Sequence, residues 1–262
     1  MLTQMNCRLP DGSWKELPAE EVFDLWLDPE HTAVVSIDMH RGHVGPEPEL
    51  PCPAPRARDR IAAHNVFHSA ARELQVPVIH VQHWQRHGGI DDLNSKAHNR
   101  RANWRVLYPL FLPENQLTDE LNWEGTKWLD LMVEEDPRDY YIRSKKRLSA
   151  FYPTDLEFLL RQLDVHNVVL DGTLTDCCVL NSAFDAANRD FRVIVPPDLT
   201  AGLSEESEEQ ALAVIARHLG LVLNAPAVVR EWAARREAPV PAGFAEAETA
   251  GEVVAATRAA TV

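Results

Sequence analysis

The segment of residues 167–188, NVVLDGTLTDCCVLNSAFDAAN, constrains the fold of this chain more than any other. It opens with an apolar run at residues 168–170, breaks at Gly172 and continues through a polar turn that holds Cys177 and Cys178. Apolar side chains then return at helical spacing, at Val179, Ala183 and Ala186. This order predicts a strand, a tight turn and a helix, with a thiol at the start of the helix.

A thiol in that position has two interpretations. Free cysteines often act as small apolar residues in a core. The partial positive charge of a helix N-terminus, however, stabilises the thiolate, which is the reactive form of cysteine. In a parallel sheet flanked by helices, chemistry gathers outside the carboxyl ends of the strands, where Cys177 and Cys178 would lie. The position therefore favours a nucleophile.

Further apolar runs alternate with helical patterns along the rest of the chain. The runs predict strands at residues 33–38, 76–81, 140–144, 191–195 and 221–223, and the helical patterns cover residues 56–74, 154–163, 205–219 and 225–235. Strands that alternate with helices indicate parallel pairing with right-handed crossovers. We therefore expect an α/β fold built on one mainly parallel sheet of about six strands.

The composition fits one substantial core. Of the 262 residues, 45% are hydrophobic, and no internal repeat is evident. The net charge of -14 and the isoelectric point of about 5.2 disfavour nucleic acids and anionic membranes as partners. The first residues lack the apolar core of a signal peptide, and no apolar run approaches the ~20 residues of a membrane span. With only four cysteines, we expect a cytoplasmic protein without a disulfide framework.

Three regions are expected along the chain. Residues 1–30 form a polar arm with a short helical patch, residues 31–235 form the main domain, and residues 236–262 form a mobile tail or a clasp on a neighbouring subunit. Within the domain, residues 82–139 are long, irregular and rich in aromatic side chains. Loops of this length are usually functional or disordered, and the aromatic content favours a pocket wall or a subunit interface.

Three chemically complementary residues follow predicted strands of this sheet. Asp38 ends the strand at residues 33–38, Lys145 follows the strand at residues 140–144, and Cys178 follows the strand of the central segment. Because the carboxyl ends of parallel strands meet at one edge, we expect the three side chains to meet there. The lysine would favour a thiolate, and the aspartate could take the thiol proton and deliver it to a leaving amine. Taken singly, Asp38 could be a turn residue and Lys145 part of a solvated basic run.

The motifs at these strand ends resemble one known family. IDMH at residues 37–40, SAF four positions after Lys145, and GTLTDCCVLNSAFDA at residues 172–186 are similar to the isochorismatase-like cysteine hydrolase superfamily, over about residues 32–232. The resemblance implies a flavodoxin-like three-layer α/β/α fold and a homodimer or homotetramer. It also implies hydrolysis of small amides by an Asp, Lys and Cys triad, and no cofactor is expected.

The triad of that family has a counterpart at each position of this sequence. Its aspartate corresponds to Asp38, and its lysine corresponds to Lys145. The family nucleophile precedes a valine, which favours Cys178 over Cys177. The resemblance therefore assigns the triad to Asp38, Lys145 and Cys178.

The resemblance also implies how a substrate is held. The family's unusual cis peptide falls between Thr173 and Leu174, and the amides of Leu174 and Cys178 would form the oxyanion hole. The residues expected to contact the substrate are His43 and Thr173, which lie in or near these motifs, and Trp84 and Trp104, which belong to the aromatic segment at residues 82–139.

Some positions depart from the family pattern. The usual glutamine and asparagine after the Asp-Met pair are His40 and Arg41, and an aromatic residue commonly found next is His43. The floor of the pocket is therefore expected to be polar, which favours a ureide or another polar amide over an aromatic one. Four arginines could hold a substrate carboxylate, although exposed arginines are the ordinary explanation: Arg41, Arg100, Arg101 and Arg105.

No metal site is expected. Metal-binding members carry an Asp-x-His shortly after the first strand, and the interval that follows IDMH has none. The triplet at residues 164–166 lies between a predicted helix and a predicted strand, at the opposite end of the sheet. His80, His83 and His87 could collect a metal, but scattered surface or pocket histidines are the simpler interpretation.

The leading hypothesis is a cysteine amidohydrolase that cleaves a small amide or ureide through a thioester and releases ammonia or an amine. One alternative is an isochorismatase-type vinyl-ether hydrolase, although members of that branch usually lack the cysteine. Another is a non-catalytic member that binds a ligand or a partner in the same pocket. The candidate substrates are a biuret-like ureide, an N-carbamoyl acid, a maleamate-like acid, nicotinamide and the lactam of an amide antibiotic.

Overall fold

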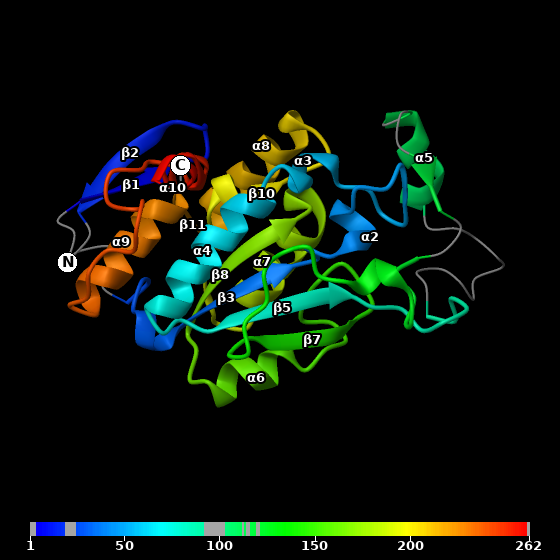
Figure 1. Cartoon of the computed structure of the whole chain (residues 1–262), viewed down its shortest axis with the longest axis horizontal. Coiled ribbons are helices and arrows are strands. Elements are labelled where there is room, and N and C mark those ends of the chain that lie inside the picture. The colour runs from blue at the N-terminus through cyan, green and yellow to red at the C-terminus, as the bar shows by residue number, and fades with distance from the viewer. Residues whose placement is uncertain are drawn as a thin grey trace.

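A parallel sheet forms the centre of the computed structural model (Figure 1). The structure describes residues 4–18, 25–91, 103–111, 113, 116–118 and 121–260. Six strands run in the order β11-β9-β8-β3-β5-β7, and the short β10 pairs with the end of β8. The strands are β3 (Thr32–Ile37), β5 (Val78–His83), β7 (Tyr140–Lys145), β8 (Asn167–Thr173), β9 (Arg192–Val195), β10 (Thr200–Ala201) and β11 (Gly220–Val222). The predicted α/β fold with a mainly parallel sheet is confirmed.

The two middle strands explain where a site can form. Every residue of β3 and β8 is buried, as expected for parallel strands that helices cover on both faces. From β3 the chain adds β5 and β7 on one side, and it then returns to add β8, β9 and β11 on the other side. The connections therefore diverge between β3 and β8, and ligands of open α/β sheets bind outside the carboxyl ends of strands at such a point.

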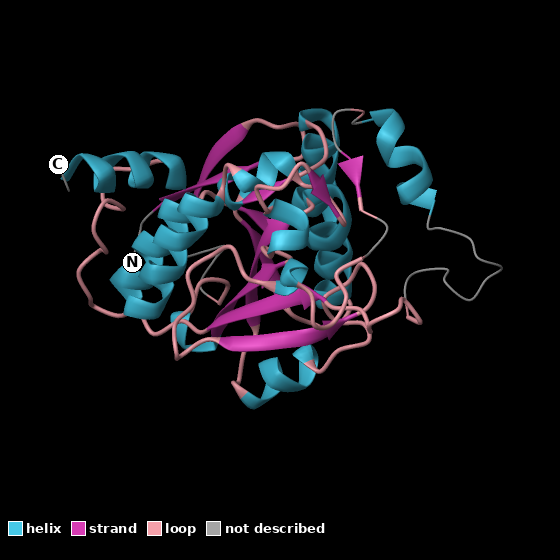
Figure 2. Cartoon of the chain, turned by 45° about the vertical axis from the view of Figure 1, so that its right-hand side comes forward, coloured by secondary structure: helices cyan, strands magenta, loops and turns pink. Residues whose placement is uncertain are grey.

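Helices cover both faces of the sheet (Figure 2). On one face, α4 (Ile61–Glu73), α9 (Ala225–Arg235) and α10 (Ala250–Ala260) share an apolar core with Val34 and Val169. On the other face, α6 (Leu156–Gln162), α7 (Leu180–Ala187) and α8 (Glu205–Val214) share a core with Val35 and Leu170. Successive residues of one strand thus face opposite layers. The result is the three-layer arrangement that the resemblance implies.

Smaller elements flank this core. β1 (Gln4–Arg8) and β2 (Trp14–Pro18) form an antiparallel hairpin, and β4 (Glu49–Leu50) pairs with β6 (Gln116–Leu117). Three helices lie in segments that join the strands, namely α2 (Arg41–Val44), α3 (Pro55–Arg58) and α5 (Asn103–Phe111). The hairpin differs from the predicted polar arm because Met5 and Cys7 enter the core of the α4 face. Part of the predicted helical patch, residues 19–24, lies outside the described residues.

Two predicted helices differ from the observed ones in their internal structure. The helix predicted over residues 56–74 is divided into α3 and α4 by a turn at Asp59 and Arg60. At this turn, an Arg60 guanidinium N–H donates to the carbonyl of Asp198 at 3.1 Å. The helix predicted over residues 205–219 begins as α8 and ends in a π-helical turn, Ile215–Leu219.

Residues 236–260 differ from the mobile tail that the composition predicts. Phe244, Ala250 and Val253 are buried in the same core as α4 and α9. The buried carboxylate of Asp198 accepts hydrogen bonds from the amide N–H of Ala225 at 3.0 Å and of Ala250 at 2.7 Å. These two amides belong to the first residues of α9 and α10, so one side chain fixes the start of both helices.

We expect Asp198→Ala to lower the free energy of unfolding by about 2–4 kcal/mol, because it leaves two helix-terminal N–H groups without their acceptor. Urea unfolding at neutral pH measures the change. Glu246→Ala is the matched control, because Glu246 is an exposed carboxylate of the same C-terminal segment. Equal stability of the two variants would contradict the capping role of Asp198.

A buried polar layer lies between α4 and the sheet. The Nε2–H of His68 donates to Asp171 Oδ2 at 2.9 Å, and the Arg72 guanidinium donates twice to the carboxylate of Asp139, at 2.9 and 2.7 Å. His80 adds a contact of 3.0 Å to the same carboxylate. Burial opposes ionisation of Asp171, yet the neighbouring His68 holds the pKa of Asp171 below its usual value.

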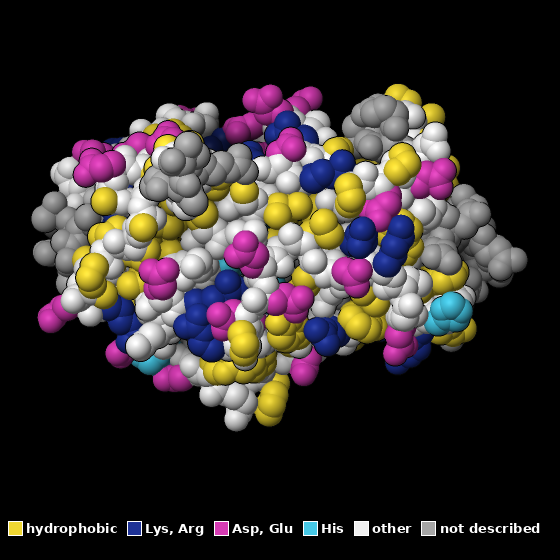
Figure 3. Space-filling view, in the orientation of Figure 1, with side chains coloured by type: hydrophobic (Ala, Val, Ile, Leu, Met, Phe, Trp, Pro, Cys, Tyr) yellow, Lys and Arg dark blue, Asp and Glu magenta, His cyan; other side chains and the backbone are white. Residues whose placement is uncertain are grey.

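The outer surface is polar and mixed in charge on the face seen in Figure 1. Figure 3 shows acidic and basic side chains interspersed with apolar ones over this face. Among the described residues, no helix combines the length and the apolar character that a membrane crossing requires.

Candidate active site

The three residues of the predicted triad meet at the carboxyl edge of the sheet. Asp38 directly follows β3, Lys145 ends β7, and Cys178 lies in the turn after β8. The Lys145 ammonium donates to Asp38 Oδ2 at 2.6 Å and to Cys178 Sγ at 3.3 Å. The exposed fractions of Asp38, Lys145 and Cys178 are 0%, 1% and 7%. The lysine thus bridges the carboxylate and the sulfur in a site that is almost closed to solvent.

The backbone around Asp38 fixes its carboxylate. Asp38 has a φ of 59°, in the left-handed region that aspartate adopts more readily than most residues. Its amide N–H donates to the carbonyl of Val81 at 2.8 Å. Its Oδ1 accepts the amide N–H of His83 at 2.8 Å, which leaves Oδ2 to Lys145. Both carboxylate oxygens therefore have fixed partners, and the side chain cannot rotate away from the lysine.

The turn after β8 places Cys178. A Cβ on Gly172, whose φ is 100°, would lie 2.1 Å from a carbonyl oxygen of β3, so glycine allows the two strands to meet at the site. The peptide bond between Thr173 and Leu174 is cis, where the resemblance implies one. A π-helical turn, Thr175–Val179, follows and holds Cys178 at the start of α7. The structure thus has the strand, turn and helix that the sequence predicts.

Ser182 is a site residue that the sequence did not single out. Its hydroxyl donates to the carbonyl of Cys178 at 2.6 Å and accepts the amide N–H of Ala150 at 2.9 Å. Ser182 therefore links the turn of the nucleophile to the segment that follows Lys145. The signal for this role lies in the motifs themselves, because Ala150 and Ser182 each belong to an SAF triplet.

Charge pairing sets the protonation of the three residues. Burial opposes ionisation of Asp38, but the Lys145 ammonium holds the pKa of the carboxyl well below its usual value. Burial also opposes the charge on Lys145, and Asp38 with Cys178 keeps the pKa of the ammonium above its usual value. A hydrogen bond with Cys177 and burial raise the pKa of the Cys178 thiol. The resting site therefore holds a carboxylate, an ammonium and a thiol.

Three histidines surround the carboxylate of Asp38. His40 is completely buried, with Nδ1 at 2.8 Å from the carbonyl of Trp128 and Nε2 at 3.9 Å from Asp38 Oδ1. The ring of His43 lies 4.8 Å from that of His40 and 6.2 Å from that of His83. Burial lowers the pKa of His40 to about 3, and it also lowers the pKa of His43 and of His83. The floor of the site is therefore polar and uncharged at neutral pH.

These histidines predict that the protein loses stability in mild acid. An unfolded histidine takes up a proton near pH 6.5, whereas His40 in the folded chain does so only near pH 3. Stability is therefore present above pH 6.5 and falls as the pH drops below it, by on the order of 2 kcal/mol at pH 5 from His40 alone. Asp38 and Asp171, whose pKa values are lowered, do not contribute between pH 7 and 5 because they are ionised in both states.

Urea unfolding at pH 7 and pH 5 measures this loss. His40→Gln removes the titrating group, so its free energy of unfolding should change less between the two pH values than that of the unaltered chain. His218→Gln is the control, because His218 is exposed and should leave the pH dependence as it is. An unaltered chain that is equally stable at pH 7 and pH 5 would contradict the neutral, buried state of His40.

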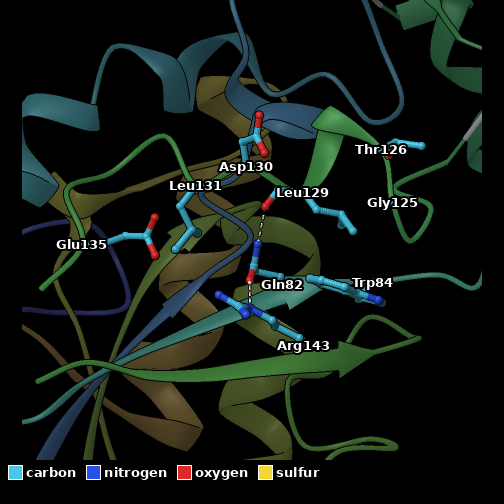
Figure 4. Close-up of a pocket in the computed structure, with 9 residues that line it drawn as sticks. All are labelled: Gln82, Trp84, Gly125, Thr126, Leu129, Asp130, Leu131, Glu135 and Arg143. Carbon is cyan, nitrogen blue, oxygen red and sulfur yellow. Dashed lines mark hydrogen bonds between the residues drawn. The ribbon is translucent and has the colours of Figure 1, made fainter. Parts of the chain in front are cut away.

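The predicted substrate contacts do not all lie near the triad. A ring nitrogen of His43 lies within 4.8 Å of a carboxylate oxygen of Asp38. Thr173 ends β8 at the same edge, and its hydroxyl donates to the carbonyl of Ala201 at 3.3 Å. Trp84 lines a separate cavity of about 300 Å³ on the β5 and β7 side, beside Arg143 (Figure 4). The other lining residues are Gln82, Gly125, Thr126, Leu129, Asp130, Leu131 and Glu135. The side chain of Trp104 lies outside the described residues.

Of the four arginines that could hold a substrate carboxylate, only the side chain of Arg41 lies within the described residues. Its guanidinium lies 2.7 Å from Glu47 Oε1 and 3.5 Å from Asp130 Oδ2, so the side chain is already paired with carboxylates of the protein. Arg100, Arg101 and the side chain of Arg105 lie outside the described residues. The oxyanion hole at the amides of Leu174 and Cys178 stays a prediction.

The histidines named as possible metal ligands are not brought together. His80 pairs with Asp139 under α4, and His87 is exposed against the ring of Trp123. Only His83 lies near the triad, where its ring nitrogen, one of His43 and the sulfur of Cys52 lie within 4.8 Å of one another. The sequence did not associate Cys52 with these histidines, because it is far from His83 along the chain.

Comparisons with known proteins identify the family and the fold of this chain. Residues 32–227 match the family model for the Isochorismatase domain. The isochorismatase family protein PncA of Bacillus subtilis is 37% identical over 117 residues, which span 41% of this chain and 63% of that protein. The ureidoacrylate amidohydrolase RutB of Rhizobium rhizogenes is 30% identical over 196 residues, which span 71% of this chain and 76% of that protein.

A solved structure shares the fold. The cysteine hydrolase from Pseudomonas syringae pv. phaseolicola matches with a TM-score of 0.64 at 23% sequence identity, over 80% of this chain and 96% of that one. Its sheet and helical layers therefore correspond to those described above, although most of the side chains differ.

Proposed function

The chain belongs to the isochorismatase family, and from this premise we propose that it is a hydrolase that cleaves the C–N bond of a small amide or ureide, with Cys178 as the nucleophile. The observation that carries the proposal is the position of the Lys145 ammonium, which contacts both Asp38 Oδ2 and Cys178 Sγ. Burying an ion pair costs desolvation energy that apolar side chains of similar volume would not cost. A buried ion pair in contact with a thiol therefore favours a catalytic role over a packing role.

The arrangement supports one sequence of proton transfers. As Cys178 Sγ attacks the amide carbon, the thiol proton passes to the Asp38 carboxylate, and the Lys145 ammonium balances the negative charge on the sulfur. The tetrahedral oxyanion collapses with cleavage of the C–N bond, and Asp38 returns the proton to the departing nitrogen. Water then attacks the thioester, and the same carboxylate serves as base and restores the thiol. The amides of Leu174 and Cys178 are the proposed oxyanion donors.

The polar floor of the site supports a ureide as the substrate class. The Nδ1–H of neutral His40 donates to the carbonyl of Trp128, so its Nε2 can only accept a hydrogen bond, and Nε2 has no hydrogen-bond partner within the described residues. Neutral His43 can both donate and accept. Compared with a simple amide, a ureide carries a second N–H on the carbonyl carbon of the scissile bond and can use such partners. The relative from Rhizobium rhizogenes, a ureidoacrylate amidohydrolase, agrees with this class.

Ammonia release from a panel of small amides tests the proposal. We expect ureides and N-carbamoyl acids to be hydrolysed faster than nicotinamide, and mass spectrometry of the quenched reaction should find an acyl adduct on Cys178. Absence of both ammonia and amine across the panel, with no adduct on the thiol, would favour a non-catalytic binding protein. A homodimer or homotetramer remains part of the proposal, and size-exclusion chromatography with light scattering tests it.

His43→Phe should change the substrate preference. The phenyl ring removes the hydrogen-bonding nitrogens, so we expect KM for a ureide to rise about tenfold while nicotinamide is hydrolysed relatively better. Steady-state kinetics with both substrates measure the ratio of the two kcat/KM values. Trp84→Phe is the control, because Trp84 lines the separate cavity beside Arg143 and should leave the ratio unchanged. An unchanged ratio in His43→Phe would remove His43 from the substrate site.

A further inference from the structure

A group of side chains that could hold a metal ion lies at the end of the sheet opposite the triad. One ligand atom each from His31, Asp164 and His166 falls within 4.8 Å of the others. His31 Nδ1 lies 3.3 Å from Asp164 Oδ2, and His166 Nε2 lies 3.5 Å from Asp164 Oδ1. His31 precedes β3 and Asp38 follows it, so the length of the strand separates this group from the catalytic residues.

The sheet itself holds the two histidines side by side. Thr32 pairs with Asn167 in the parallel register of β3 and β8, and His31 and His166 directly precede these two residues. The amide N–H of His166 donates to the carbonyl of His31 at 2.8 Å. Their rings are stacked, with centroids 4.8 Å apart and an angle of 14° between the planes. The two imidazoles are therefore preorganised by the ladder of two central strands.

A further hydrogen bond orients the ring of His31. Its Nδ1 lies 2.9 Å from the carbonyl oxygen of Asp164, and an N–H there leaves the lone pair on Nε2. Histidines that bind metals commonly donate their other ring nitrogen to a backbone carbonyl in this way. Asp28 Oδ2 lies 4.0 Å from Nε2 and offers a second carboxylate.

We propose that His31, Asp164 and His166, with Asp28 beside them, bind a divalent transition-metal ion of the zinc type. Imidazole and carboxylate are ligands that zinc accepts, and bond lengths of about 2.0–2.2 Å place the donors of a tetrahedral site roughly 3.3–3.6 Å apart. The 3.5 Å between His166 Nε2 and Asp164 Oδ1 matches this spacing, and one ligand atom from each of the three residues lies within 4.8 Å of the others. The Asp164 and His166 side chains are 75% and 49% exposed, so the ion can enter from solvent and water can complete its coordination.

The bound ion would stabilise the folded chain and would take no part in catalysis. It joins the segment before β3 to the short connection between α6 and β8, which meet at this end of the sheet. An ion that binds the folded chain and not the unfolded chain raises the melting temperature by mass action. The proposal does not depend on the function assigned to Cys178.

Titration calorimetry with Zn²⁺ tests the site on the unaltered chain and on two variants, His31→Gln and His166→Gln. We expect each substitution to weaken one equivalent of zinc binding at least tenfold and to abolish the corresponding rise in melting temperature. His218→Gln is the matched surface control. Cys52→Ser controls for the His43, Cys52 and His83 group near the triad, and neither control should affect this equivalent.

The outcomes separate the possibilities. Zinc binding that is identical in the unaltered chain and in both site variants would overturn the proposal, as would the absence of any zinc binding to the unaltered chain. Loss of all zinc binding in Cys52→Ser would assign the ion to the catalytic pocket and would also overturn it. Mg²⁺ should bind far more weakly than Zn²⁺, because imidazole ligands do not favour it. The melting temperatures without metal verify that each variant is folded.

Discussion

Cys178→Ala is expected to lower kcat for amide hydrolysis at least ~1000-fold, because it removes the sulfur that contacts the Lys145 ammonium and that is proposed to form the thioester. The fold should survive, since the change removes one sulfur atom from a wall of the α7 core and costs about 1–2 kcal/mol. Ammonia release measures the activity, and thermal unfolding measures the stability. A variant that keeps a tenth of the activity would rule out the proposed mechanism.

Cys177→Ala is the matched control for that experiment. Cys177 lies in the same π-helical turn, and its hydrogen bond with Cys178 is the largest cause of the raised pKa of the Cys178 thiol. We expect this variant to keep its activity and to react faster with iodoacetamide at pH 8, because the Cys178 thiolate becomes more populated. Loss of activity in Cys177→Ala together with full activity in Cys178→Ala would reverse the assignment of the nucleophile.

Asp38 and Lys145 should show strong energetic coupling. Asp38→Asn or Lys145→Met alone leaves the other charge buried without its partner, and we expect each to lower the free energy of unfolding by about 3–5 kcal/mol. The double variant should recover most of that loss, because it removes both charges, and asparagine keeps the oxygen that accepts the His83 amide. All three variants should be inactive.

A double-mutant cycle by urea unfolding measures this coupling. A coupling free energy of at least about 2 kcal/mol would be consistent with a desolvated pair, whereas additive effects of the two single variants would contradict the buried contact. Arg161→Met with Glu157→Gln provides the control cycle, because that pair is exposed at 44% on both sides and should couple by less than about 1 kcal/mol.

The sheet and the triad could be predicted because both leave local signals. The buried strands β3 and β8 appear in the sequence as short apolar runs, and parallel pairing brings their carboxyl ends together whatever the intervening chain does. Asp38, Lys145 and Cys178 each stand at such an end. Their meeting thus follows from topology, without any knowledge of the loops.

The parts that could not be predicted depend on contacts between distant segments. His40 is buried because the loop at residues 128–132 packs over it. That loop has no periodic hydrophobic pattern from which this contact could be predicted. In the sequence, Asp198 resembles an ordinary turn residue. Its role depends on the hydrogen bond from the first residue of α10, which lies more than fifty residues downstream. Trp84 was assigned to the substrate pocket by composition alone, but its position beyond the end of β5 directs it to the cavity beside Arg143.

The packing of α10 on α4 has a consequence for how the protein is made. Residues 250–253 complete a layer whose other members, α4 and the strands β3 and β5, are translated far earlier. Until these residues leave the ribosome, the apolar side chains of α4 that α10 covers stay exposed to water, where chaperones and other nascent chains can bind them. Folding on this face therefore finishes only after residues 250–253 have been synthesised.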